Sequence, residues 1–106
     1  MTYKPRFAQD RLKEYANWFR AVLVLGARQV GKTTLLREVF PALPLITFDP
    51  VQDLHGARHD PDLFLDSFPA PLILDEIQYA PELLAALKRR VDRSDKPGQY
   101  FLTGSQ

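Results

Sequence analysis

The residues whose spacing suggests chemistry begin at Gly26, where the chain follows the pattern G-x-x-x-x-G-K-[ST] of a phosphate-binding loop, or P-loop. The glycines of such a loop permit a tight turn, and backbone N–H groups at the following helix N-terminus bind a triphosphate. Lys32 adds a charge for the β- and γ-phosphates, and Thr33 adds a hydroxyl for Mg²⁺, which prefers oxygen ligands. The predicted nucleotide-binding residues of this segment are Gly26, Ala27, Arg28, Gln29, Val30, Gly31, Lys32, Thr33 and Thr34.

The alternative for this segment is a glycine-containing turn before a helix, with no ligand. A chance match to the pattern arises in roughly one chain of this size in a few hundred. Here the match follows an apolar run at 21–25 and precedes a helical pattern at 32–40, which is the context that a P-loop requires. This context favours the phosphate-binding interpretation, although the side chains of Arg28 and Gln29 could equally point into water.

A pair of carboxylates, Asp75 and Glu76, follows the apolar run 72–74. Alone, such a pair is commonly a solvated loop feature. Behind a P-loop, an acid at the end of a second buried strand holds Mg²⁺, and we assign this role to Asp75, through water. Glu76 is then placed to accept a proton from the attacking water or to orient it, which makes Glu76 and Lys32 the predicted catalytic residues.

The residues around this acidic pair favour hydrolysis over related reactions. GTPases usually carry D-x-x-G here, whereas this chain has Gln78 at the glycine position. The adjacent glutamate favours water as the nucleophile over the hydroxyl of a small-molecule acceptor. Gln78 itself either braces the acidic pair or caps the turn.

Alternating apolar runs and amphipathic patterns predict an α/β fold of three layers around a mainly parallel sheet. Parallel sheets bind ligands beyond the carboxyl ends of their strands, and the fourth strand is expected between the first and the third. Thr103 and Ser105 would then lie near the γ-phosphate as candidates to hold water or sense the phosphate, or else form a polar exit turn. The predicted helices are 7–18, 32–40, 60–68 and 81–93, and the predicted strands are 21–25, 45–48, 72–74 and 100–102.

The P-loop run, the Leu-Asp-Glu-Ile-Gln of residues 74–78 and the Leu-Thr-Gly-Ser of residues 102–105 resemble prokaryotic AAA-type P-loop ATPases with a C-terminal domain of uncharacterised function. The resemblance covers nearly the whole chain and implies ATP and Mg²⁺ as ligands. Family members continue with a fifth strand, a helical lid and the C-terminal domain. The resemblance therefore implies a partial ATP-binding domain over 1–106, with a helical lead-in at 1–20 and an incomplete core at 21–106, truncated after the fourth strand.

The resemblance implies Mg-dependent ATP binding and hydrolysis, with hydrolysis impaired in this partial domain. The alternative is a nucleotide-binding switch or interaction module without turnover, in which self-association or a protein partner would matter. A small-molecule kinase shares the P-loop, but no acceptor pocket is marked.

Composition limits the other function classes. The formal net charge of +1 at pH 7 does not indicate nucleic acid, and the helix-end basic cluster Lys88, Arg89, Arg90 and Arg93 suits a helix dipole at least as well. The chain has no cysteine for disulfides or thiolate metal sites. It shows neither a signal peptide nor an apolar run of about 18 residues, so we expect a cytoplasmic protein without membrane contact.

Overall fold

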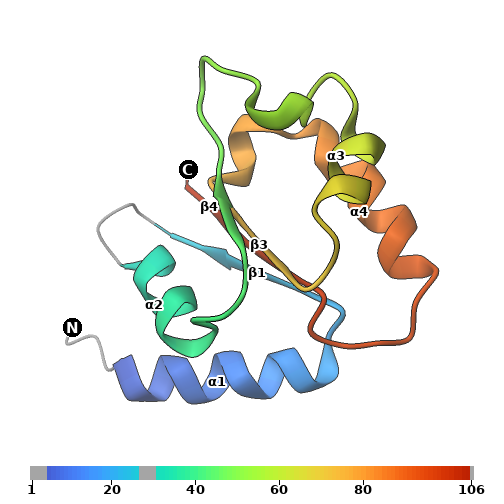
Figure 1. The fold of residues 1–106 in the computed structure, drawn as a ribbon. Coiled ribbons are helices and arrows are strands. Elements are labelled where there is room, and N and C mark those ends of the chain that lie inside the picture. The colour runs from blue at the N-terminus through green and yellow to red at the C-terminus, as the bar shows by residue number, and fades with distance from the viewer. Residues whose placement is uncertain (1–4, 27–30, 106) are drawn as a thin grey trace.

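Four parallel strands form a single sheet in the order β1-β4-β3-β2 in the computed structural model, which describes residues 5–26 and 31–105 (Figure 1). The sheet strands and the helices alternate along the chain, as predicted, and β4 lies between β1 and β3. The elements are α1 (Pro5–Trp18), β1 (Ala21–Leu25), α2 (Lys32–Val39), β2 (Leu45–Thr47), η2 (Leu54–Gly56), α3 (Pro61–Ser67), β3 (Leu72–Asp75), η3 (Ile77–Tyr79), α4 (Glu82–Asp92) and β4 (Tyr100–Gly104).

The strand register aligns the carboxyl ends of all four strands along one edge of the sheet. Leu25 at the end of β1 pairs with Gly104 of β4, and Thr47 at the end of β2 pairs with Asp75 of β3. Because every strand pair is parallel, the residues that follow these ends emerge on the same side of the molecule. Polar residues from distant parts of the chain therefore meet at this edge.

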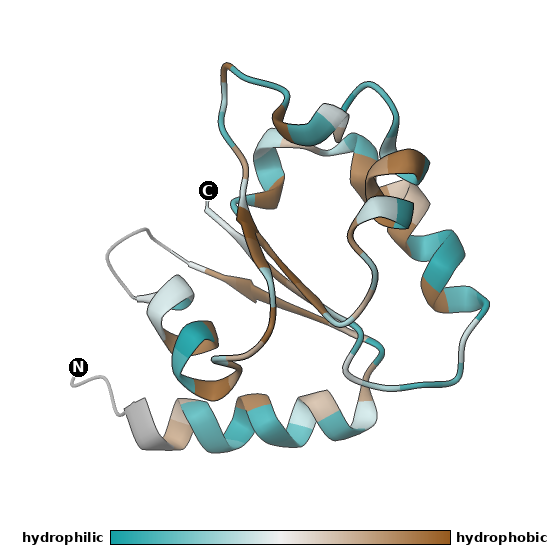
Figure 2. Ribbon diagram, in the orientation of Figure 1, coloured by the Kyte–Doolittle hydropathy of each residue, from teal (hydrophilic) through white to brown (hydrophobic). Residues whose placement is uncertain are grey.

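Helices cover both faces of the sheet, which confirms the predicted three layers (Figure 1). Alternate residues of each strand enter opposite layers, as the two-residue period of a strand requires. In β4, Phe101 joins the core under α1 and α2, whereas Tyr100 and Leu102 join the core under α3 and α4. The strands are accordingly the most apolar segments of the molecule, and the outward helix faces are polar (Figure 2).

The first strand differs from its prediction as a strand buried on both faces. Leu23 is 50% exposed and Leu25 is 57% exposed, because β1 is an edge of the described sheet and the core on the α4 side centres on β3 and β4. Trp18 at the end of α1 is also exposed, and so is Leu84 on α4. An apolar run indicates that a strand is suited to burial. It does not indicate whether a neighbouring element of the fold covers that strand.

The ends of the helices follow local signals. Asp60 caps α3 by accepting a hydrogen bond from the Leu63 N–H at 3.2 Å, and Pro61 occupies the first turn. The cap thus explains where α3 begins without reference to function.

No helix within residues 5–26 and 31–105 combines the length and the apolar character needed to cross a bilayer.

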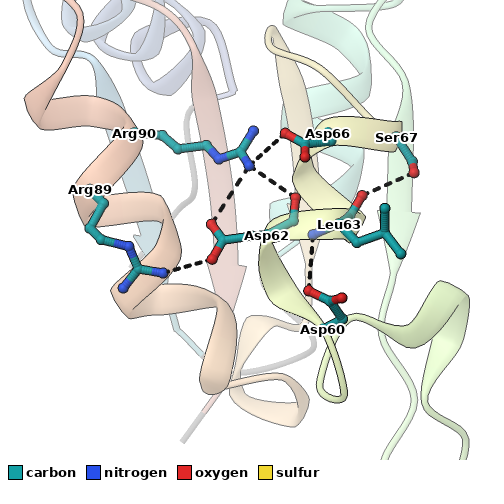
Figure 3. Close-up of polar contacts among 7 residues, drawn as sticks. All are labelled: Asp60, Asp62, Leu63, Asp66, Ser67, Arg89 and Arg90. Carbon is teal, nitrogen blue, oxygen red and sulfur yellow. Dashed lines mark hydrogen bonds and ion pairs between the residues drawn. The ribbon is translucent and has the colours of Figure 1, made fainter.

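The basic cluster of α4 contacts acidic residues of α3 (Figure 3). Arg89 lies 3.0 Å from a carboxylate oxygen of Asp62, and Arg90 lies 2.7 Å from one of Asp66. Arg90 also donates to the backbone oxygen of Asp62 at 2.9 Å. These intramolecular contacts support a structural role for the two arginines in joining α3 to α4.

Candidate functional site

Polar residues from α2, β3 and β4 converge beyond the carboxyl ends of the strands, and we call them the carboxyl-edge cluster. Hydrogen bonds link Lys32 to Ser105, Thr33 to Asp75, Thr103 to Asp75 and Ser105 to Glu76. The cluster thus comprises Lys32, Thr33, Asp75, Glu76, Thr103 and Ser105. Of the other predicted binding residues, Ala27, Arg28, Gln29 and Val30 lie outside the described residues, and Thr34 is exposed on α2.

The backbone at Gly31 brings the start of α2 to the cluster. Gly31 adopts φ 74° and ψ 33°, a left-handed conformation that glycine reaches without the strain of a side chain. Its carbonyl accepts a hydrogen bond from Leu35 N–H at 2.9 Å, which closes the first helical turn. Lys32 and Thr33 therefore stand in the first turn of the helix, where backbone N–H groups lack helical acceptors.

Lys32 is a buried cation, and its hydrogen-bond acceptors within residues 5–26 and 31–105 are neutral oxygens. Its side chain is 4% exposed, and Nζ donates to the Gly26 carbonyl at 2.6 Å and to Ser105 Oγ at 2.8 Å. No carboxylate within the described segments forms an ion pair with it. A lysine has three N–H donors, so an anion could still bind to this group.

Asp75 is buried and accepts hydrogen bonds from hydroxyl groups of three different elements. Oδ1 accepts from Thr33 Oγ1 at 2.7 Å and from Thr103 Oγ1 at 2.5 Å, while Oδ2 accepts from Thr47 Oγ1 at 2.9 Å. The carboxylate orientation is therefore determined from β2, β4 and α2 at once.

Sequence reasoning missed Thr47, which ends the second strand. Its only sequence signal was a hydroxyl residue at a strand end, and such residues are common. Its importance follows from strand pairing, since the register puts Thr47 directly opposite Asp75.

The pair Thr33 and Asp75 has the donor chemistry of a magnesium site. Both supply oxygen atoms, and these atoms are 2.7 Å apart. No group of three or more histidine or acidic side chains able to hold a metal occurs in residues 5–26 and 31–105.

Glu76 stands at a strained backbone position. Its φ of 61° and ψ of 50° are left-handed, and its N–H donates to Thr103 Oγ1 at 2.9 Å. A non-glycine residue in this conformation costs about 1–2 kcal/mol. Its carboxylate accepts a hydrogen bond from Gln78 Nε2 and lies 3.5 Å from Ser105 Oγ. Strain retained at a position whose side chain meets a polar cluster is typical of functional sites.

We expect the Glu76→Gly variant to have a free energy of unfolding about 1 kcal/mol above that of Glu76→Ala, because both lack the carboxylate and only alanine retains the strain. Urea denaturation measures the difference. The same pair of substitutions at Glu14, exposed within α1, should show the opposite order, since alanine favours a helix. Equal stabilities of the two Glu76 variants would contradict the assigned strain.

The two predicted residues of the fourth strand both lie in the carboxyl-edge cluster. Thr103 is fully buried, and its hydroxyl joins Asp75 to the backbone of Glu76. Ser105 accepts from Lys32 through Oγ and donates its backbone N–H to Gln78 Oε1 at 3.2 Å. Their predicted contact with a γ-phosphate stays a prediction, but both have defined contacts that a plain exit turn would not require.

Comparison with known proteins adds a family and two relatives. The family described as AAA domain matches residues 19–106, which contain all four strands. Uncharacterised proteins of Mycobacterium bovis and Mycobacterium tuberculosis are each 36% identical over 106 residues, or 99% of this chain. The chain spans 24% of the length of each of these relatives. No solved structure matches the chain significantly.

Proposed function

This chain belongs to the AAA domain family of nucleotide-binding ATPases, and from that premise we propose that it binds ATP with Mg²⁺ and hydrolyses it, at a rate lowered in this partial domain. The observation that carries the proposal is the 2.7 Å hydrogen bond between Thr33 and Asp75. It joins the helix that follows the P-loop to the acidic end of β3, so that the two halves of a magnesium–phosphate site are in contact.

In the proposed complex, the triphosphate lies at the N-terminus of α2. Backbone N–H groups in the first turn of α2 and the dipole of that helix stabilise its negative charge. Lys32 Nζ binds β- and γ-phosphate oxygens, and in doing so it gives up its contact with Ser105 Oγ.

The family match begins at Phe19, which supports dividing the chain into a lead-in at 1–20 and a core from 21 onward.

Thr33 and Asp75 are the proposed magnesium-side residues, and Asp75 acts through water. The Mg²⁺ ion that they would hold would supply positive charge against the charge that develops on the leaving phosphate. Thr47 and Thr103 hold the Asp75 carboxylate in place through their hydroxyl groups.

Glu76 is the proposed general base. A water oxygen forms a bond to the γ-phosphorus, the bond from that phosphorus to the β–γ bridging oxygen breaks, and ADP leaves. The Glu76 carboxylate accepts the proton that the attacking water loses. Lys32 stabilises the charge that develops on the transferred group.

Titration with a fluorescent ATP analogue, with Mg²⁺ or with EDTA, tests the binding half of the proposal. We expect Asp75→Asn to remove the gain in affinity that Mg²⁺ gives, on the order of tenfold, because the magnesium-side carboxylate is lost. Asp95→Asn, at an exposed turn residue, is the matched control and should keep the full gain. An Asp75→Asn chain that responds to Mg²⁺ like the parent would refute the assignment. Tight ATP binding without phosphate release would instead favour the nucleotide-binding switch.

A further inference from the structure

We infer that Gln78 is a positioning residue, which orients the Glu76 carboxylate for hydrolysis and couples it to Ser105. This inference rests on the proposed function, because it assigns a role in ATP turnover. Among the described residues, the Gln78 side chain forms hydrogen bonds with Glu76 and Ser105. It would therefore act on ATP through these two residues.

The side-chain amide of Gln78 uses both of its ends. Nε2 donates to Glu76 Oε2, and Oε1 accepts from the backbone N–H of Ser105 at 3.2 Å. The orientation of the amide follows from chemistry, since a backbone N–H can only donate and an ionised carboxylate can only accept. Among common side chains of this length, only glutamine bridges these two partners.

These contacts do not fit the alternative of a cap for the local turn. Both partners of the amide lie in the carboxyl-edge cluster, and Ser105 is 27 residues away in sequence. A cap would bond to the backbone of η3 itself, and no such bond from the Gln78 side chain occurs in the described part of the chain. The hydrogen bonds therefore link β3 to β4 across the site.

The amide adds a second link between Ser105 and the proposed general base, beside the 3.5 Å contact between Ser105 Oγ and Glu76. Lys32 Nζ contacts Ser105 Oγ at 2.8 Å, Ser105 contacts Gln78, and Gln78 contacts Glu76. The strained backbone of Glu76 puts its side chain within reach of a residue only two positions later. In the nucleotide-free chain, Gln78 thus connects Glu76 to Ser105, the residue that contacts Lys32.

Without the amide, the Glu76 side chain regains freedom about its rotatable bonds. Proton transfer requires the base within hydrogen-bond distance of the water, so fewer complexes are competent at any moment. We expect the loss to lower kcat by about tenfold and to leave KM within about twofold, because phosphate binding does not involve this amide.

Two variants of Gln78 separate its two hydrogen bonds. Gln78→Met keeps the length of the side chain and removes both polar ends. Gln78→Glu keeps an oxygen acceptor for Ser105 N–H but replaces the donor to Glu76 with a second carboxylate. Gln52→Met, at an exposed residue that does not belong to the carboxyl-edge cluster, is the matched control.

Steady-state phosphate release and amide hydrogen exchange of Ser105 are the two measurements. We expect low kcat in both Gln78 variants, faster Ser105 exchange only in Gln78→Met, and parental values in Gln52→Met. Parental kcat in Gln78→Met overturns the inference, and so does an equal loss of ATP binding, which would indicate a merely structural role.

Amide hydrogen exchange of Ser105, measured in the nucleotide-free chain, distinguishes failure of this inference from failure of the proposed function. A parent that does not bind Mg-ATP, or binds it without releasing phosphate, refutes the proposed function and with it the role in turnover. A parent that hydrolyses ATP while Ser105 exchange is identical in Gln78→Met refutes the Gln78 contact alone.

Discussion

Replacing Glu76 with glutamine is expected to lower the rate of ATP hydrolysis by about a hundredfold or more, the usual contribution of a general base. Glutamine has nearly the same shape and can still contact Gln78 and Ser105, but it cannot accept a proton from water. Because Glu76 does not stand on the P-loop helix or beside Thr33, Mg-ATP affinity should stay within about threefold of the parent value.

Single-turnover phosphate release measures this effect separately from product release, and the fluorescent ATP analogue measures affinity. Glu82→Gln, at an exposed residue in the first turn of α4, controls for the loss of one negative charge. Unchanged turnover in Glu76→Gln would show that this carboxylate is not the base. A parallel loss of affinity would place Glu76 in nucleotide binding instead.

Replacing Lys32 with methionine is expected to have two opposite effects. Mg-ATP affinity should fall on the order of 100-fold, about 2.7 kcal/mol, because the charged contacts to the β- and γ-phosphates are lost. The nucleotide-free chain should become about 1 kcal/mol more stable, since an apolar side chain replaces a buried cation that has no anionic partner among the residues that the structure describes.

Binding titration and urea denaturation of the same preparation measure the two effects. Lys13→Met, at an exposed position of α1, is the control and should change neither quantity appreciably. Loss of stability in Lys32→Met would show that the hydrogen bonds to Gly26 and Ser105 outweigh the burial of the charge. Retained affinity would refute the phosphate-binding role of Lys32.

Local signals in the sequence were sufficient to predict the order of the main helices and strands and the type of each. The strand at 72–74 and the helix that starts near residue 60 depend on neighbours within one strand or one turn, and both predictions agree with the structure. The parallel sheet also followed, because strands that alternate with helices must return in the same direction. The exposure of Leu23 and Leu25 did not follow, since it depends on which element lies beside β1.

The sequence by itself determined the residue types that can bind a triphosphate and Mg²⁺, because a P-loop is a contiguous motif with a fixed order. Only the tertiary structure decided how the acidic residues are held. Thr47 reaches Asp75, and Gln78 reaches Ser105, through the pairing of strands that are distant in the chain. Such contacts leave no periodic or contiguous pattern, because they arise from the order and register of the strands in the sheet.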